Sequence, residues 1–348
     1  MKPLQLLLVG AVFTMSACAL NSLNGAEKGM TPTEADRAWL LPAQPSFPPN
    51  NAPTEARIQL GKALFFDPRL SKDKSMSCAT CHSPMMGWSD GLPTAKNVHG
   101  KFVARATPTM VNLGYNKILQ WDGKKNTLED QAVGPMTSPT VMSIDGPELI
   151  KFLNESKGYK ELFAKAYPGE KIDNGTLAKA VAAYERTIIS SNSPFDRWIK
   201  GDSKAMTAQQ IKGFRLFSDP AKGNCTACHQ APNFTDNGFH NLGLASYGVD
   251  KPDMGRYVIK PLPSMKGAFK TPTLREIDQT APYFHDGSAK TLMDVVDHYV
   301  KGGVTKKDVS PNIKPLTLNQ EEKEAIVAFM HALTSDKEPF ALPVIPLD

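Results

Sequence analysis

The sequence CATCH at residues 78–82 and the sequence CTACH at residues 225–229 repeat one pattern, Cys-x-x-Cys-His. Two thiols one helical turn apart can add to the two vinyl groups of a haem, and the next histidine can then bind the iron. Zinc or structural disulfides, the weaker alternatives, would not need a histidine directly after the second cysteine both times. We therefore predict two covalently bound c-type haems. The residues that hold them are Cys78, Cys81, His82, Cys225, Cys228 and His229.

A second repeat precedes each haem motif. Residues 61–68 and 213–220 both read Gly-x-x-Leu-Phe-x-Asp-Pro. Proline disfavours the helical conformation for the residue before it, so both segments are expected to be helices that end at Asp-Pro. Capping-box patterns at residues 207–210 and 317–320 predict further helices, and strand-like alternation is scarce. We therefore expect an all-α protein with two related haem domains.

The domain limits follow from these repeats and from local composition. The Ser- and Pro-containing connector at residues 190–194 is the expected boundary. The expected segments are an export signal at 1–19, an extended N-terminal segment at 20–50, haem domains at 51–190 and 195–335, and an extended tail at 336–348.

The N-terminus has the composition of an export signal. Met1 and Lys2 precede an apolar run, and small residues with one cysteine, Cys18, follow it. Cleavage after Ala17 would leave Cys18 first and open to lipid attachment, whereas cleavage after Ala19 would remove it. Contact with a membrane is expected only through such a lipid anchor.

Length and charge narrow the function classes. The chain has 348 residues, enough for two domains, and a formal net charge of +5. Basic residues do not cluster with aromatic residues, which argues against nucleic acid as a partner.

Three further short sequence motifs lie outside the haem motifs. They are Trp121-Asp122-Gly123, the segment 128–135 and the segment 281–287, which reads Ala-Pro-Tyr-Phe-His-Asp-Gly. With the haem motifs they resemble the bacterial dihaem cytochrome c peroxidase family, which includes the MauG-type enzymes, over about residues 50–335. The resemblance implies two cytochrome c-like domains, with a first haem that reacts with hydrogen peroxide and a second haem that supplies or shares oxidising equivalents.

The resemblance also assigns roles around the first haem. Trp121 matches a tryptophan between the haems, although a core aromatic residue is the simpler reading of it. Gln131 and Pro135 match peroxide-pocket positions. His99 matches a histidine that closes the first haem in resting peroxidases, although a loop histidine is usually solvated.

Two positions depart from the family pattern. Val141 replaces a pocket glutamate that moves a proton during cleavage of peroxide. Its replacement could be His99, Gln131 through a water molecule, or Asp145 or Glu148 after a loop rearrangement; otherwise peroxide activation is slow. Calcium between the haems would be bound by the backbone carbonyls of Thr280 and Pro282, but the matching asparagine is replaced by Ala106, so calcium stays an open expectation.

The segment VVDHYVKGG at residues 295–303 contains the candidate sixth ligand. Helical phase places Tyr299 on the apolar face, and places His298 roughly 100° away, on the side with Asp294 and Lys301. A core tyrosine is the alternative reading. By resemblance, Tyr299 stands where MauG-type enzymes have a tyrosine and ordinary peroxidases a methionine. A phenolate favours ferric and higher oxidation states of iron, so it suits stored oxidising power better than electron intake.

Three functions remain open from the sequence. The first is a periplasmic MauG-like enzyme that uses hydrogen peroxide to oxidise a partner protein, at a tryptophan or tyrosine. The second is a cytochrome c peroxidase that takes electrons from a small redox protein. The third is a non-catalytic electron-transfer or sensing cytochrome, for which Val141 is the main argument.

Overall fold

A computed structural model of the protein describes residues 31–336 and 339–347. The predicted export signal and Cys18 lie outside the described residues. Within the described part, no helix is long and apolar enough to cross a membrane.

The described chain is built from short helices joined by long loops, with one two-stranded antiparallel sheet. The α-helices are α2 Glu55–Phe66, α3 Cys78–Cys81, α4 Leu128–Ala132, α5 Gly134–Thr137, α6 Gly146–Glu155, α7 Lys157–Ala166, α8 Asn174–Glu185, α9 Pro194–Ile199, α10 Ala208–Ser218, α11 Leu292–Val300 and α12 Gln320–His331. The strands are β1 Phe239–His240 and β2 Phe269–Lys270. The 3-10 helices are η1 Glu34–Trp39, η2 Pro49–Asn51, η3 Pro68–Leu70, η4 Pro84–Met86, η5 Leu113–Tyr115, η6 Cys225–Ala227, η7 Ala245–Gly248, η8 Arg256–Val258, η9 Pro263–Met265 and η10 Ile277–Gln279.

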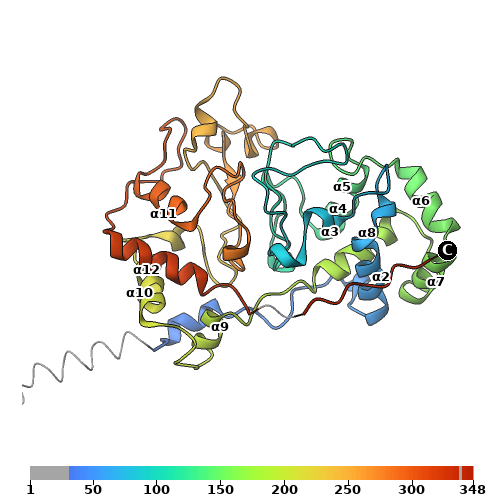
Figure 1. The fold of residues 1–348 in the computed structure, drawn as a ribbon, viewed down its shortest axis with the longest axis horizontal. Helices are drawn as coiled ribbons and strands as arrows, with labels where there is room; N and C mark the ends of the chain where they lie inside the picture. Colours follow the sequence, from blue (N-terminus) through green and yellow to red (C-terminus); the bar gives the residue numbers. More distant parts are fainter. Residues whose placement is uncertain (1–30, 337–338, 348) are drawn as a thin grey trace, which may run out of the picture.

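Two hydrophobic cores divide the molecule into halves (Figure 1). The first core is formed by residues between 60 and 188, and the second by residues between 195 and 333 together with Trp39. The expectation of an extended segment at 20–50 is therefore wrong in part, because η1 and η2 form there and Trp39 packs edge-on against Phe195 and Phe214.

The Gly-x-x-Leu-Phe-x-Asp-Pro repeat forms the same helix in both halves. Helix α2 ends at Asp67 and helix α10 ends at Asp219, as the following prolines predicted. The glycine of each repeat lies against the backbone of a later helix. A Cβ atom on Gly61 would lie 2.0 Å from the carbonyl oxygen of Ala180 in α8, and one on Gly213 would lie 1.8 Å from that of Ala325 in α12. Glycine is needed at both positions because only it permits this close helix approach.

The chain end returns to the first half. Residues 339–347, which we name the C-terminal strap, run beside α2 and α7 in Figure 1. Phe340 stacks on Phe66 at 5.4 Å, and Lys62 donates a hydrogen bond to the Ala341 carbonyl oxygen at 2.7 Å. The described part of the chain end has no regular secondary structure, and it packs on the first core.

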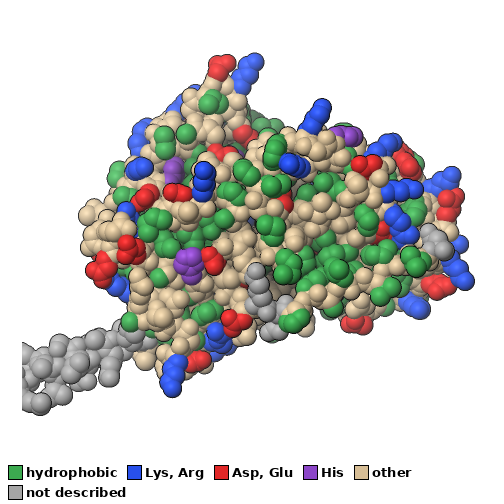
Figure 2. Space-filling view, in the orientation of Figure 1, with side chains coloured by type: hydrophobic (Ala, Val, Ile, Leu, Met, Phe, Trp, Pro, Cys, Tyr) green, Lys and Arg blue, Asp and Glu red, His purple; other side chains and the backbone are tan. Residues whose placement is uncertain are grey.

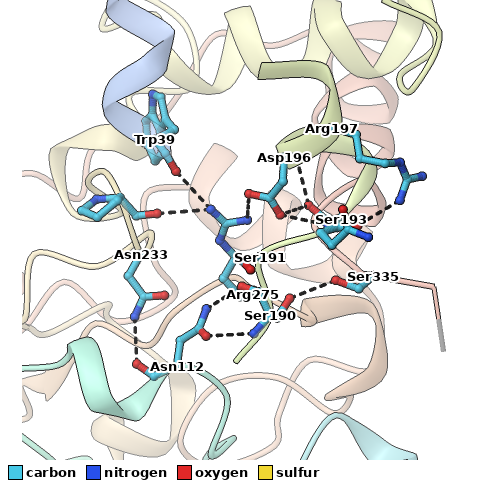
Figure 3. A network of polar contacts seen from close by, with 12 residues as sticks. Trp39, Asn112, Ser190, Ser191, Ser193, Asp196, Arg197, Asn233, Arg275 and Ser335 are labelled. Atoms are coloured by element: carbon cyan, nitrogen blue, oxygen red, sulfur yellow. Dashed lines mark hydrogen bonds and ion pairs between the residues drawn. The ribbon is translucent and has the colours of Figure 1, made fainter. Parts of the chain in front are cut away.

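The linker between the halves is held by a polar network (Figure 3). Asn112 of the first half and Ser190 of the linker exchange two hydrogen bonds of 2.9 Å, and the Ser190 hydroxyl donates to Glu276 of the second half. In the same network, Arg275 forms an ion pair with Asp196 in the first turn of α9.

Charge is distributed without a dominant sign on the visible face. Figure 2 shows acidic and basic side chains interspersed around the rim of that face, while apolar side chains gather over the half that contains the first core.

Candidate dihaem site

The first haem motif forms one short helical turn on the first core. Ser77 and Thr80 make a capping box around α3, and the His82 N–H donates to the Cys78 carbonyl oxygen at 2.9 Å. His82 Nδ1 lies 3.2 Å from the Trp88 carbonyl oxygen, which leaves Nε2 for a metal. Burial lowers the pKa of His82, so the imidazole is neutral and able to bind iron. The two thiols are free and close to apolar residues of the first core.

The second motif has the same local geometry. The His229 N–H donates to the Cys225 carbonyl oxygen at 2.8 Å, and His229 Nδ1 lies 2.9 Å from the Phe234 carbonyl oxygen. Burial lowers the pKa of His229 to about 4, which keeps this imidazole neutral as well. Two thiols and a neutral imidazole held by a backbone carbonyl form a donor set that fits a covalently attached haem.

A largely apolar cavity of about 280 Å³ adjoins the second motif, and we name it the second cavity for that reason. Its walls include Cys225, Cys228, His229 and Tyr299 from the second half, and Trp121 from the first half. Two cysteines, a histidine and a tyrosine therefore border a single, largely apolar space, and the cysteines and histidine fit a covalently attached haem.

A second candidate metal site lies beside this cavity. Its residues are Cys228, Asp236 and His240, whose ligand atoms lie within 4.8 Å of one another. Attachment of a haem uses the Cys228 sulfur as a thioether and removes it from this group. The repeated haem motif favours attachment, since it accounts for the cysteines of both halves.

Tyr299 lies where helical phase placed it. It comes from α11, which Thr291 caps, and burial raises its pKa, with a smaller contribution from Cys228 and Cys225. Helical phase places His298 on the side with Asp294 and Lys301, but this side is not exposed to solvent at His298. His298 is buried, and its Nε2 lies 2.8 Å from the Leu242 carbonyl oxygen, because a distant loop covers that side. His298 and Met293 are not among the described residues that line the cavity.

The two halves meet through a pair of matching hydrogen bonds. The Ala106 N–H donates to the His285 carbonyl oxygen at 2.7 Å, and the Lys270 N–H donates to the Trp121 carbonyl oxygen at 2.8 Å. The rings of Trp121 and His285 meet edge to face with centroids 6.3 Å apart. The Trp121 indole N–H donates to the Ala106 carbonyl oxygen at 2.9 Å. Trp121 thus lies in the junction and borders the second cavity.

This junction reveals a duplication that the haem motifs alone did not show. Ala106 corresponds to Lys270, Trp121 to His285, and Pro135 to Tyr299, all at one constant spacing along the chain. The structure repeats with it: bridges join Leu119 to Lys125 and Tyr283 to Ala289, and Thr127 and Thr291 cap the helices that follow. Comparison of the segments 119–130 and 283–294 could have identified His285 from sequence, and the same spacing applied to Ala106 leads to Lys270.

Comparisons with known proteins show the family of this chain. Residues 55–204 match the family model of di-haem cytochrome c peroxidase. The methylamine utilization protein MauG of Methylorubrum extorquens is 38% identical over 97% of this chain and 94% of that protein. The cytochrome c551 peroxidase of Pseudomonas aeruginosa is 34% identical, over 84% of this chain and 83% of that protein. The chain belongs to the dihaem cytochrome c peroxidase and MauG family.

Solved structures of dihaem cytochrome c peroxidase and MauG family proteins share the fold. A MauG-like protein associated with microbial copper homeostasis superposes with a TM-score of 0.79 at 29% identity, covering 86% of this chain and 95% of that one. The diheme peroxidase BthA of Burkholderia thailandensis gives 0.71 at 22% identity, covering 85% and 92%, and shows the fold alone. As a member of this family, the chain is an oxidoreductase that acts with hydrogen peroxide, and the family carries two haems.

The positions that match the family's peroxide pocket lie around α4 and α5. The Gln131 side-chain oxygen accepts a 2.6 Å hydrogen bond from the Gln120 amide, so the Gln131 amide N–H groups are left for a ligand. Pro135 is the second residue of α5, and its carbonyl oxygen accepts from the Met142 N–H.

Val141, which replaces the family's glutamate, lies beside a loop that carries a histidine. Val98 donates a 2.9 Å backbone hydrogen bond to Val141, so the loop that carries His99 lies beside Val141, but the His99 side chain is exposed. Asp145 caps α6 and is exposed, as is Glu148. Sequence reasoning missed Glu185, a buried carboxyl in α8 close enough to influence Cys78. Burial raises the pKa of Glu185 to about 8.

The expected calcium ligands lie together in the wall of the second cavity. Ala106, Thr280 and Pro282 all line it, and Pro282 follows a cis peptide bond. Ala106 supplies no side-chain oxygen, and its carbonyl oxygen accepts the Trp121 hydrogen bond. A cation here would depend on the carbonyl oxygens of Thr280 and Pro282 and on water.

Proposed function

We propose that this protein is a MauG-like enzyme that uses hydrogen peroxide to oxidise a partner protein in the periplasm. In this proposal residues 51–190 and 195–335 are the two haem domains. The first haem is held by Cys78, Cys81 and His82, and the second by Cys225, Cys228, His229 and Tyr299. The single observation that carries the proposal is the position of Tyr299 in the wall of the second cavity.

The duplication strengthens the assignment of Tyr299. In the first half the corresponding residue is Pro135, which has no atom that can bind iron. At this position the first half would offer no side-chain ligand to a bound haem, whereas the second half would offer a phenol. A phenolate ligand favours ferric and higher states, which suits a site that stores oxidising equivalents and disfavours electron intake from a high-potential donor.

When bound, the two haems would supply the redox chemistry, and the chain's residues would direct it. The free amide N–H groups of Gln131 would be available to donate to hydrogen peroxide held at the first site. The indole of Trp121 borders the route between the halves, and its N–H donates to a backbone carbonyl, which is a poor base. An oxidised Trp121 would therefore keep its proton and could pass the charge on without a proton transfer. Overall, hydrogen peroxide takes two electrons and two protons from the partner and becomes two water molecules.

The competing function is a cytochrome c peroxidase with a small redox protein as electron donor. Relatives of both kinds match the chain. The lack of a methionine at position 299 disfavours electron intake. A third candidate, a non-catalytic cytochrome, rests on Val141, because a valine cannot move the proton that peroxide cleavage requires.

Spectra of the ferric protein and of the peroxide-treated protein test the proposal, with Tyr299→Phe beside Tyr283→Phe as a matched control. Tyr283 lines the same cavity and keeps the cavity shape comparable. Only Tyr299→Phe should change the spectrum of the second haem. The iron-ligand assignment fails if both variants keep the wild-type spectrum.

The partner reaction is tested separately. Wild-type enzyme, hydrogen peroxide and candidate periplasmic proteins are mixed, and mass spectrometry then searches for an oxidised tryptophan or tyrosine. Steady turnover with a small cytochrome, and no modified partner, would select the peroxidase alternative. Metal analysis of the purified protein tests whether it binds calcium. Lipid attachment at Cys18 is decided by the mass of the mature N-terminal peptide.

A further inference from the structure

Lys270 places a buried cation in the wall of the second cavity. Its side chain is 8 % exposed, and its Nζ donates a 2.6 Å hydrogen bond to the Thr271 carbonyl oxygen. The acidic side chain that influences the Lys270 pKa is Asp236. Its carboxylate already accepts a hydrogen bond from the Gly238 N–H at 2.7 Å and lies 2.8 Å from His240 Nε2. Among residues 31–336 and 339–347, no acidic side chain forms an ion pair with Lys270.

A buried ammonium group with only a carbonyl partner is costly. Burial lowers the pKa of Lys270 to about 8, and Asp236 offsets this only in part. Proteins normally keep such a cation only where an anion pairs with it. The structure thus points to an anionic group that belongs in this cavity.

The duplication shows that the fold does not require this lysine. The corresponding residue in the first half is Ala106, and its backbone makes the equivalent hydrogen bond across the junction. The backbone role is therefore independent of the side chain. The ammonium group is specific to the second site.

We infer that Lys270 is the counter-ion for a carboxylate of the group that occupies the second cavity, which for a c-type haem is one of its two propionates. This inference rests on the haem assignment in the proposed function. A neighbouring positive charge stabilises ferrous iron relative to ferric iron, so Lys270 would raise the reduction potential of the second haem. It would act beside Trp121, to whose backbone it is bonded.

Three variants of the holoprotein test this role. Lys270→Met removes the charge and the hydrogen bond, Lys270→Gln removes the charge but keeps a donor, and Lys270→Arg keeps the charge. Lys314→Met is the matched control, because Lys314 lines the same cavity but is exposed to solvent. Haem content is measured first, and a redox titration followed by electron paramagnetic resonance then separates the two ferric haems.

The two charge-removing variants should lower the equilibrium constant for reduction of the second haem on the order of tenfold, or about 59 mV for one electron. Lys270→Arg and Lys314→Met should stay near wild type. Resonance Raman bands of the propionates should shift in Lys270→Gln and should not shift in Lys270→Arg. An unchanged potential and unchanged propionate bands in Lys270→Gln would overturn the inference. These readouts use no peroxide and no partner, so they can fail while the proposed oxidation of a partner stands.

Discussion

Replacing Arg275 by methionine should destabilise the second half strongly. The side chain of Arg275 is 0 % exposed and that of its partner Asp196 is 1 % exposed, with the charged atoms 2.5 Å apart (Figure 3). Arg275 also donates to the carbonyl oxygens of Trp39, at 3.2 Å, and Pro232, at 3.3 Å. One side chain therefore connects η1, α9 and the loop that follows the second haem motif.

The cost follows from what the substitution leaves behind. Asp196 would keep two hydrogen bonds from Ser193, at 2.9 and 2.7 Å, but would lose its counter-ion inside the protein. Breaking a buried pair on one side costs roughly 3–5 kcal/mol, because the remaining charge is buried and unpaired. Arg275→Met should lower the free energy of unfolding by about that amount, a large share of the stability of a typical domain.

Denaturant unfolding, followed by haem absorbance and tryptophan fluorescence, measures this loss. Lys212→Met is the control, because the ion pair of Lys212 with Glu321 is exposed and should contribute less than about 1 kcal/mol. The double variant Arg275→Met, Asp196→Asn should recover part of the loss, since no charge is then buried alone. If Arg275→Met costs no more than the Lys212 control, the reasoning from burial is refuted.

Three further changes test other parts of the molecule. Val141→Glu restores the missing carboxylate and should speed the reaction with hydrogen peroxide by at least about 10², with Val141→Ile as the stopped-flow control; equal rates would show that the glutamate position is not limiting. Glu185 has a folded-state pKa near 8, above its unfolded value, so its contribution to stability is present below pH 4.5 and is lost as the pH rises to 8. Glu185→Gln should therefore raise the free energy of unfolding by several kcal/mol at pH 8.5 and change it little at pH 4.5, and a gain independent of pH in denaturant titrations would contradict this. Phe340→Ala should cost the first half about 1–2 kcal/mol by removing the stacked ring of the strap, whereas Leu342→Ala, at a 73 % exposed residue, should cost almost nothing in the same unfolding assay.

The features that sequence predicted well are those determined by a few neighbouring residues. The helix ends before Pro68 and Pro220 and the cap at Thr207 depend on local geometry, and the structure has each of them. Tyr299 was placed correctly because helical phase depends only on spacing within one helix. The roles assigned to these side chains by resemblance stay predictions until they are measured.

The features that sequence missed depend on segments that are distant in the chain. His298 has a polar-side position by helical phase, but the loop at Leu242 covers it and provides a hydrogen-bond acceptor. The strap could be read as an extended tail, yet nothing in its own residues indicates that Phe340 packs on Phe66. Glu185 was overlooked because a glutamate at the end of a helix is usually exposed.

The duplication gives a physical account of how one fold can serve two different haems. The halves share the haem motif, the glycine that lets two helices touch, and the matching hydrogen bonds at the junction, so the two sites start with the same frame. They then differ at corresponding positions: Pro135 against Tyr299, and Ala106 against Lys270. In the proposed assignment, Tyr299 would add a ligand and Lys270 a positive charge to the second site, whereas Pro135 and Ala106 would add neither to the first. The backbone hydrogen bond of Lys270 does not depend on its side chain, because Ala106 makes the equivalent bond in the first half. We therefore expect the difference in chemistry between the halves to lie in a few side chains on a common scaffold.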